Sequence, residues 1–445
     1  MNIVLLSGGS GKRLWPLSND IRSKQFIKIF KKPENSKGNP EDIYESMLQR
    51  VYRQIKTVDS DATVTIATSK SQVSAIHNQI GADVGISVEP CRRDTFPAIA
   101  LATAYLHDVQ GIGLDEVVVV CPVDPYVDDE YFEALNKLSE LAEQDVANLV
   151  LMGIDPTYPS AKYGYIIPST KDQVSKVDTF REKPDEPTAQ KYIDQGGLWN
   201  GGVFAYKLRY VLDRAHELID FTDYADLFSK YETLTKISFD YAVVEHEKDI
   251  AVLRFAGEWK DLGTWNTLSE AMDENVIGEG ILNEECSNVH VINEMGVPIL
   301  VMGIKDAVIS ASTDGILVSD KEQSAAIKPF VDEINQQVMF AEKSWGTYKV
   351  LDVEEESITV KITLKAGQHM NYHSHERRNE VWTIISGTGK TIVDGMEQPV
   401  KPGDVITMDA GCKHTVIADS ELQIIEVQLG KGITVTDKKK YELNI

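Results

Sequence analysis

Short apolar runs alternate with helical patterns through residues 1–270 of the chain. Two stretches, Ile43 to Ile55 and Pro97 to Asp108, carry apolar residues at spacings of three and four, which predicts helices with one buried face. Other runs are rich in β-branched residues and end at turn signals, which predicts buried strands: Asn2 to Leu6, Thr63 to Ala67, Glu116 to Val120 and Leu149 to Gly153. This alternation favours a mostly parallel sheet with helices on both faces, whose ligands bind beyond the carboxyl ends of the strands.

The pattern changes in the second half of the chain. Short β-rich pieces replace the helical periods between Leu282 and Ala326, and a helix is predicted from Ile327 to Gln337. From Ser344 onward, strands and turns follow one another, with glycines at close intervals, which is typical of a small β-barrel or sandwich. We therefore predict three parts: residues 1–281 as an α/β domain, 282–337 as a β-rich connector and 338–445 as an all-β barrel.

Composition and charge exclude several classes of protein. At roughly 150 residues per domain, 445 residues predict about two to four domains. The net charge of −24 would be repelled by nucleic acid and by anionic membranes, and no apolar run reaches the length of about 18 residues that a membrane-spanning helix needs. The N-terminus lacks the features of a signal peptide, and the four cysteines form no Cys-x-x-Cys pair. We expect a cytoplasmic protein with no nucleic-acid partner and no membrane partner.

A glycine-rich loop with an unusual charge follows the first predicted strand. Its sequence, Ser7-Gly8-Gly9-Ser10-Gly11-Lys12-Arg13, matches neither the Walker A loop nor the dinucleotide-binding fingerprint. Glycines let a backbone approach a phosphate closely and expose its N–H groups. Residues 1–33 carry seven basic side chains against the single acid Asp20, a net +6 in an acidic protein. This local charge predicts a site for a polyanion.

The loop and six later segments resemble the sugar-1-phosphate nucleotidyltransferases. The pattern Gly8-Gly9-x-Gly11-x-Arg13-Leu14-x-Pro16-Leu17, with Trp15 and Lys24-Gln25-Phe26, is similar to the mannose-1-phosphate guanylyltransferase branch, although Ser23 stands where the family usually has Pro. The later matches occur in order through about residue 335, and they include departures at Asp94 (usually Asn) and Pro125 (usually His). These segments are Glu89-Pro90-x-x-Arg93-Asp94-Thr95, Val123-Asp124, Phe180 to Pro184, Leu198 to Gly202, Ser238 to Val243 and Trp259 to Trp265. The resemblance implies a Rossmann-like nucleotidyltransferase domain.

The chemistry of such enzymes explains these residue types. A sugar phosphate attacks the α-phosphorus of a nucleoside triphosphate in line and expels pyrophosphate, so the protein must align two anions and neutralise their charge. Carboxylates suit Mg²⁺, which makes Asp124 and Asp261 the metal candidates, while Arg13 and Lys24 would contact phosphates. By resemblance, the sugar phosphate would bind to Gly164, Glu182, Lys183 and Asn200. The nucleotide would bind to Leu6, Ser7, Gly8, Gly9, Ser10, Gly11, Lys12, Arg13, Glu89, Arg93, Asp94 and Thr95.

Four of the nine histidines lie between residues 369 and 414. Gly367-x5-His373-x-His375-x4-Glu380-x6-Gly387 and the later His414 resemble the cupin motifs, with Asp409 and Ala418 as departures from the second motif. His373 and His375, two apart on a strand, would point to the same face. Three imidazoles and the Glu380 carboxylate suit Zn²⁺, Fe²⁺, Mn²⁺ or Ni²⁺, which predicts a second divalent metal in a C-terminal cupin barrel. Barrel histidines that bind no metal are the alternative.

The cupin leaves two functions open. In the family, a cupin after a guanylyltransferase is often a type II phosphomannose isomerase, which interconverts mannose 6-phosphate and fructose 6-phosphate. Here His375 and Glu380 are separated by four residues instead of two, and the family's C-terminal Tyr-Gly-Arg is absent. No cationic partner for the phosphate and no acid–base pair is assignable from the sequence. The alternative is a metal-binding cupin with a regulatory or vestigial role.

The predicted function is formation of GDP-mannose and pyrophosphate from GTP and mannose 1-phosphate, with Mg²⁺. A different NTP or hexose 1-phosphate, a bifunctional enzyme with isomerase activity, and a non-catalytic nucleotide-sugar sensor are the alternatives. Resemblance also implies a homodimer.

Overall fold

The structure, a computed structural model, describes residues 1–9, 12–19, 21–33, 43–334, 339–434 and 437–442. The chain divides into two compact units. The first comprises Met1–Ser10 and Lys24–Asp273, and the second comprises Gly11–Ser23 and Glu274–Ile445. The second unit therefore includes part of the basic N-terminal segment.

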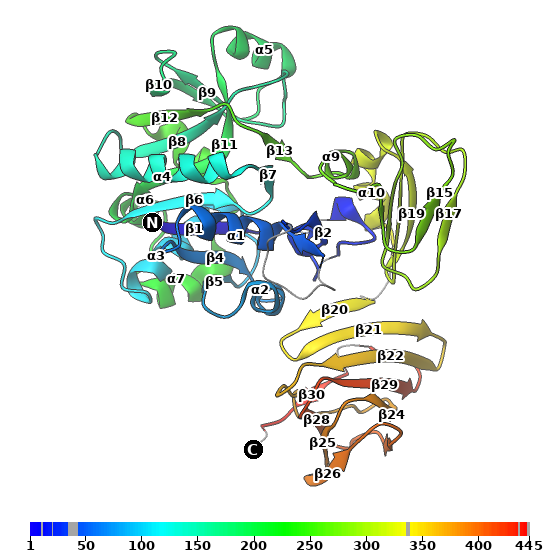
Figure 1. Cartoon of the computed structure of the whole chain (residues 1–445). Helices are drawn as coiled ribbons and strands as arrows, with labels where there is room; N and C mark the ends of the chain where they lie inside the picture. Colours follow the sequence, from blue (N-terminus) through cyan, green and yellow to red (C-terminus); the bar gives the residue numbers. More distant parts are fainter. Residues whose placement is uncertain (10–11, 20, 34–42, 335–338, 435–436, 443–445) are drawn as a thin grey trace. The chain divides into compact units, whose positions relative to one another are not determined.

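A nine-stranded mixed sheet forms the centre of the first unit, in the order β5-β4-β1-β6-β11-β8-β12-β10-β9 (Figure 1). Four neighbouring pairs are parallel (β5–β4, β4–β1, β1–β6 and β8–β12) and the others are antiparallel. The strands are β1 (Asn2–Ser7), β4 (Thr63–Ser69), β5 (Gly85–Glu89), β6 (Val117–Pro122), β8 (Leu149–Ile154), β9 (Tyr165–Pro168), β10 (Val174–Arg181), β11 (Leu198–Lys207) and β12 (Ile250–Phe255). The predicted α/β class is confirmed, but the sheet is mixed, with as many antiparallel as parallel neighbouring pairs, and the expectation of a mostly parallel sheet was wrong.

Helices cover both faces of this sheet (Figure 1). On one side, α3 (Thr95–Asp108) packs against α6 (Leu208–Leu218), α7 (Tyr224–Lys230) and α8 (Phe239–Ala242); on the other, α1 (Met47–Val58) packs against α4 (Asp129–Glu143). Ten of the fourteen residues of α3 are buried, because it lies between the sheet and the outer helices. Smaller elements of this unit are β2 (Lys28–Lys31), α2 (Val73–Ile80), β7 (Pro125–Val127), α5 (Glu186–Asp194), β13 (Trp259–Asp261) and α9 (Trp265–Glu270).

The helix predicted from Ile43 begins later than expected. Tyr44–Ser46 forms a strand, β3, that pairs with β2, and α1 begins at Met47. Ser46 and Gln49 form a capping box, in which each side chain binds the other residue's backbone N–H. This local signal ends the extended segment and starts the helix, against the apolar period that runs through both.

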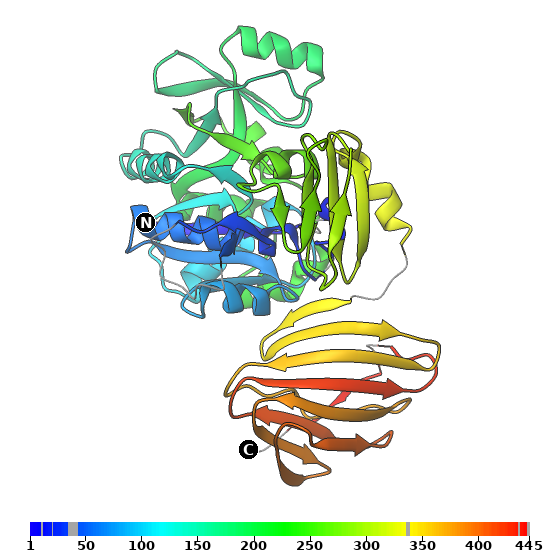
Figure 2. The same cartoon turned by 45° about the vertical axis from the view of Figure 1, so that its right-hand side comes forward.

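In the second unit, residues 274–333 form a small β structure with parallel pairs (Figure 2). Two small sheets have the orders β14-β16-β18-β19 and β15-β17, and α10 (Lys328–Asp332) follows them. The helix predicted from Ile327 to Gln337 is thus much shorter, and residues 335–337 lie outside the described part of the chain. The strands are β14 (Val276–Ile277), β15 (Gly280–Leu282), β16 (His290–Asn293), β17 (Ile299–Val301), β18 (Ala307–Ser312) and β19 (Gly315–Asp320).

The segment Gly11–Ser23 is bound to this β structure by contacts within the second unit. Arg22 forms a bidentate ion pair with Glu294 at 2.7 and 2.8 Å, and Asn19 Nδ2 donates to Asp314 at 2.7 Å. A Cβ at Gly315 would collide with the ring of Trp15, so only glycine lets the two backbones approach this closely.

The C-terminal part consists of two antiparallel sheets with a shared apolar core. One sheet has the order β20-β21-β22-β29-β24-β27 and the other β26-β25-β28-β23-β30. The alternating burial of β22 and β29 shows that one face of each strand points to the core. The strands are β20 (Phe340–Lys343), β21 (Gly346–Val353), β22 (Ser357–Leu364), β23 (His373–Ser374), β24 (Asn379–Ser386), β25 (Gly389–Val393), β26 (Met396–Val400), β27 (Val405–Met408), β28 (His414–Ala418), β29 (Leu422–Leu429) and β30 (Lys439–Lys440).

Among the described residues, no helix combines the length and the apolar character that crossing a bilayer requires.

Candidate functional site

Two aspartates and a lysine meet at the carboxyl edge of the central sheet. Asp124 follows β6, and β13 pairs antiparallel with β7, which places Asp261 opposite Pro125. Lys24 Nζ lies 2.7 Å from Asp124 Oδ2 and 3.7 Å from Asp261 Oδ1. The structure thus brings together three of the four predicted catalytic residues. The ammonium group neutralises part of the repulsion between the two carboxylates.

The two aspartates belong to a pocket of about 230 Å³ that also contains three of the predicted sugar-phosphate residues. Gly164, Glu182 and Asn200 line it as well. A Cβ at Gly164 would collide with Glu182 Oε2, so glycine leaves room for the carboxylate to face the pocket. Lys183, the fourth predicted residue, has its ammonium 2.5 Å from Glu182 Oε1 and is not among the residues that line the pocket.

Asp240 is a pocket residue that was not among the predicted site residues. Its carboxylate accepts a hydrogen bond from Asn200 Nδ2 at 2.6 Å, and Asn200 Oδ1 accepts one from the Gly202 N–H, which fixes the orientation of the amide. Burial of this carboxyl and the negative charge of Glu182 raise the pKa of Asp240 to about 6. The Ser238 to Val243 motif contains Asp240, but only its contact with Asn200, 40 residues away in the chain, identifies it as a pocket group.

Two buried polar atoms near this pocket have no hydrogen-bond partner among the described residues: Glu182 Oε2 and Trp259 Nε1. One is an acceptor and the other is a donor, and both residues line the pocket. Tyr163 also lines it, and its ring packs against Trp259 with centroids 5.5 Å apart. Sequence reasoning missed Tyr163 and Trp259, because aromatic residues in a motif are as consistent with a core as with a pocket wall. A ligand with hydroxyl groups would satisfy both unpaired atoms.

The predicted nucleotide loop is divided between the units. Leu6 and the buried Ser7 end β1, and the exposed Gly8 and Gly9 follow them, with Gly9 at a φ of 140°. Ser10 and Gly11 lie outside the described residues. In the second unit, Arg13 is exposed at its position in the short helix after the loop, whereas Lys12 forms an ion pair with Asp332 at 3.0 Å. The net +6 of residues 1–33 is therefore partly compensated, because Lys12, Arg22 and Lys24 all face carboxylates.

The second predicted nucleotide segment follows β5, at the same edge of the sheet as the end of β1. Glu89 accepts a hydrogen bond from the Tyr231 hydroxyl at 2.7 Å, and burial raises the pKa of its carboxyl. Arg93 donates to the Glu232 carbonyl. Asp94, at a φ of 71°, accepts from the Thr95 N–H at the start of α3. These residues make structural contacts here, and none of them lines the pocket with the aspartates.

The geometry suits a divalent cation beside the two aspartates of the pocket. Asp124 and Asp261 offer carboxylate oxygens beside a cationic side chain that already occupies the space between them. Oxygen ligands of this kind are what Mg²⁺ prefers, and its remaining positions are commonly filled by water and phosphate oxygens. The pocket thus combines carboxylates that suit a divalent cation with polar groups that suit a hydroxylated ligand.

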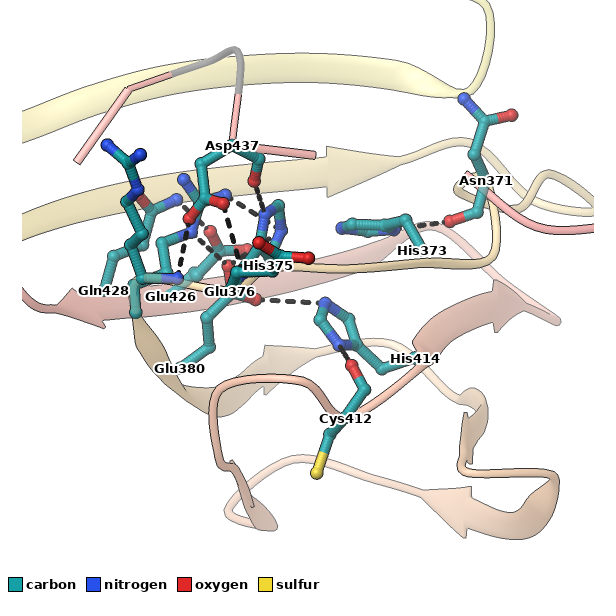
Figure 3. A network of polar contacts seen from close by, with 12 residues as sticks. Asn371, His373, His375, Glu376, Glu380, Cys412, His414, Glu426, Gln428 and Asp437 are labelled. Carbon is teal, nitrogen blue, oxygen red and sulfur yellow. Dashed lines mark hydrogen bonds and ion pairs between the residues drawn. The ribbon is translucent and has the colours of Figure 1, made fainter. Parts of the chain in front are cut away.

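A second cluster lies in the C-terminal sheets, where His373, His375 and His414 converge (Figure 3). β23 pairs with β28, which sets His373 opposite His414. Ligand nitrogens of the three buried rings all lie within 4.8 Å of one another. Burial lowers the pKa of His373 to about 2 and that of His375 to about 4, so both rings are neutral at pH 7.

Each imidazole is oriented by a backbone carbonyl. His373 Nδ1 donates to the Asn371 carbonyl at 2.6 Å, His414 Nδ1 to the Cys412 carbonyl at 3.1 Å, and His375 Nδ1 to the Asp437 carbonyl (Figure 3). A carbonyl can only accept, so each ring carries a proton on Nδ1, and in the neutral rings of His373 and His375 the lone pair is on Nε2. Such orientation is typical of metal-binding histidines.

Glu380, the fourth predicted ligand, lies on β24 beside two of these rings. Its oxygens are 3.2 Å from His375 Nε2 and 3.2 Å from His414 Nε2. Ligand atoms about 2.1 Å from one metal ion are separated by about 3.0–3.4 Å, so these distances fit a shared metal. His414 Nε2 and Glu380 Oε2 are buried without a hydrogen-bond partner among the described residues. The three histidines are thus grouped as metal ligands would be, and Glu380 lies beside two of them.

Glu426 lies next to this cluster and was not a predicted site residue. Burial and the charge of Glu380 raise the pKa of Glu426 to about 7, and Gln428 donates a hydrogen bond to its carboxylate. Together with His373, His375 and Arg378, it lines a cavity of about 220 Å³. The sequence Glu426-Val427-Gln428, in a stretch that resembles the isomerase-type cupins, was the available signal for this residue.

Comparisons with known proteins agree with this architecture. A family model described as Nucleotidyl transferase matches residues 2–276, and one described as Cupin domain matches residues 360–428. The mannose-1-phosphate guanylyltransferase of Escherichia coli (strain K12) is 27% identical over 479 residues, covering 98% of this chain and 97% of that protein. The xanthan biosynthesis protein XanB of Xanthomonas campestris pv. campestris (strain B100) is 27% identical over 477 residues, covering 99% and 97%.

Among solved structures, the chain is similar to one described as mannose-1-phosphate geranyltransferase from Thermus thermophilus. The two are 27% identical with a TM-score of 0.60, and the match covers 74% of this chain and 98% of that chain. The resemblance predicted from the ordered motifs is confirmed.

Proposed function

Because the chain belongs to the nucleotidyl transferase family, we propose that it forms GDP-mannose and pyrophosphate from GTP and mannose 1-phosphate, with Mg²⁺, at the pocket of the first unit. The names of the relatives that align over nearly the whole chain support this choice of substrates. One observation carries the proposal: Asp124 and Asp261, which Lys24 contacts, line the same pocket as Glu182, Asn200 and Asp240.

Two groups of residues at this pocket suit the two parts of the reaction. Glu182 and Asp240 offer acceptors for sugar hydroxyls. Asn200 donates one amide hydrogen to Asp240 and keeps the second for a hydrogen bond to a sugar oxygen. Lys24, in place between the aspartates, would stabilise charge on the α-phosphate and on the leaving pyrophosphate. Mg²⁺ bound to Asp124 and Asp261 would neutralise phosphate charge. The other contacts of the two substrates stay predictions: Arg13, Lys183, the glycine loop and the segment from Glu89 to Thr95.

Fixed geometry is the main contribution that these residues can make. The reaction joins two anions that repel each other, and holding them in line removes much of the entropic barrier. The half-buried position of Lys24, 20% exposed, keeps its ammonium in one place and partly out of water.

The test is a grid of four NTPs against several hexose 1-phosphates, with release of pyrophosphate as the measurement. We expect the highest kcat/KM for GTP with mannose 1-phosphate, and a loss of roughly 10²–10³-fold in Lys24→Ala. Lys28→Ala, an exposed lysine on β2, is the matched control. Another preferred pair would change the substrate assignment. Binding of a nucleotide-sugar without turnover, unaffected by Lys24→Ala, would favour a sensor.

For the cupin, the proposal is a divalent metal, Zn²⁺, Fe²⁺, Mn²⁺ or Ni²⁺, held by His373, His375, His414 and Glu380. Neutral imidazoles and one carboxylate suit these borderline metals. The division into residues 1–281, 282–337 and 338–445 and the homodimer stay predictions.

A further inference from the structure

Arg378 contacts two of the four proposed metal ligands in the cupin cluster. Its side chain is only 9% exposed. Nη2 lies 2.9 Å from His375 Nε2, and Nε donates to Glu380 Oε1 at 2.8 Å. Nη1 also donates to the Thr434 carbonyl at 3.4 Å. A buried cation is thus placed at the metal-binding side of the cluster.

The contact with His375 is incompatible with a metal on the same nitrogen. His375 Nδ1 carries its proton to the Asp437 carbonyl, so Nε2 has a single lone pair in the plane of the ring. A guanidinium N–H uses that lone pair in the structure, and a metal would need the same one. The two occupants exclude each other at His375.

Contact with Glu380 is not exclusive. A carboxylate has two oxygens, and Arg378 uses Oε1, while Oε2 faces His414 Nε2 at 3.2 Å. Arg378 could therefore keep its bond to Glu380 while a metal binds through the other oxygen. Competition is confined to one nitrogen of one ring.

A buried carboxylate needs a cationic partner, because the free energy of an uncompensated charge in a low-dielectric interior is high. Glu380 is 3% exposed, and Arg378 supplies that charge directly. Arg378 also lines the cavity of about 220 Å³, together with Glu426, so a displaced guanidinium has both space and a second carboxylate nearby.

From this geometry we propose that Arg378 is an internal cation of the cupin cluster, which occupies His375 and Glu380 without metal and must leave His375 when a divalent metal binds. The inference rests on the metal site proposed above. It predicts that the wild-type cluster binds metal less tightly than its four ligands alone would allow.

The experiment uses the full-length protein stripped of metal and titrated with Co²⁺, whose visible absorption reports imidazole coordination. We expect Arg378→Met, which keeps the apolar stem, to bind Co²⁺ about tenfold more tightly than the wild type, as expected from the loss of one charge-assisted competitor. Arg377→Met is the matched control, because Arg377 is the adjacent residue and its side chain is exposed. This variant should bind Co²⁺ as the wild type does. His414→Ala should lack the absorption band, which assigns the signal to this cluster.

Equal or weaker binding by Arg378→Met would overturn the inference and would make Arg378 a positioning residue for Glu380. If Arg378→Met fails to fold, Arg378→Lys serves instead, because a lysine cannot fork between His375 and Glu380. It should also bind Co²⁺ more tightly than the wild type, and unchanged or weaker binding would again reject the competition. Absence of the band in the wild type and in every Arg378 variant would reject the metal site itself, together with the inference.

Discussion

Carboxylates in the two clusters differ sharply in their exposure to water. In the pocket of the first unit, Asp124 and Asp261 are 37% and 45% exposed, whereas Glu380 in the cupin is 3% exposed. Both clusters contain a basic side chain between groups that would bind a metal. Lys24 neutralises two carboxylates that water already screens, while Arg378 compensates a charge that has no access to water.

This difference separates the two roles of a counter-charge. An exposed, exchangeable site allows a metal and its phosphates to enter and leave with each turnover, and its lysine can act on the substrates. In a buried site the counter-charge compensates a carboxylate that water does not reach, so it stabilises the folded protein. A metal that binds there must replace part of this counter-charge. The predictions below separate these roles, from the largest expected effect to the smallest.

The largest effect is expected from Asp261→Asn. This change removes one of two carboxylates that would bind Mg²⁺, and we expect pyrophosphate release to fall roughly 10²–10³-fold. Asp128→Asn is the control, because the Asp128 side chain makes no capping bond at the start of α4. Activity that survives Asp261→Asn at ordinary Mg²⁺ concentrations would place the metal elsewhere.

Metal should stabilise the cupin by binding only its folded form. At a Zn²⁺ concentration about 100 times Kd, we expect the free energy of unfolding to rise by about 2.7 kcal/mol. His373→Ala should lose this response, and the exposed His369→Ala should keep it. Thermal unfolding with and without Zn²⁺ is the measurement, and an equal response in both variants contradicts the assignment.

Asp240 should make stability depend on pH in the opposite sense to an ion-paired carboxylate. Its folded pKa of about 6 lies above the usual value, so folding favours the protonated form: the stabilisation is full below about pH 4 and is lost as the pH rises through 6. We expect Asp240→Asn to be about 2 kcal/mol more stable than the wild type at pH 8, with little difference at pH 4. Denaturant unfolding at both values is the check. A constant difference would show that another group is responsible.

The smallest effect is expected from Gly164→Ala. The new Cβ must displace Glu182 Oε2, and we expect KM for the sugar phosphate to rise about tenfold with little change in kcat. Gly296→Ala, where no atom lies within 4 Å of the added Cβ, controls for backbone effects. An unchanged KM would show that Glu182 adjusts without loss, or does not bind the sugar.

Local patterns predicted most of the fold. The strands that begin at Asn2, Thr63 and Leu149 lie where β-branched runs occur in the sequence. The predicted nucleotidyltransferase class is also confirmed. Prediction failed at Tyr44–Ser46, where a capping box overrides an apolar period, and in the helix that ends at Asp332. These errors concern element boundaries, which depend on a few hydrogen bonds.

Charge compensation in the basic N-terminal segment could not be predicted from the sequence. Arg22 and Glu294 are 272 positions apart, and Lys12 and Asp332 are 320 apart. Only the folded chain identifies such partners. They compensate part of the net charge of +6 that residues 1–33 carry. The same reason explains why Asp240 and Trp259 were missed, since their place in the pocket depends on segments that are remote in sequence.

The attachment of residues 12–23 to the connector limits how far the N-terminal motif can be transplanted. A shortened chain that stops at Asp273 would retain Asp124, Asp261 and Lys24, yet Trp15, Asn19 and Arg22 would lose the partners that hold them. The glycine-rich motif therefore does not carry its own structural support. Grafting it into another protein would demand the strands around Glu294 and Gly315 as well.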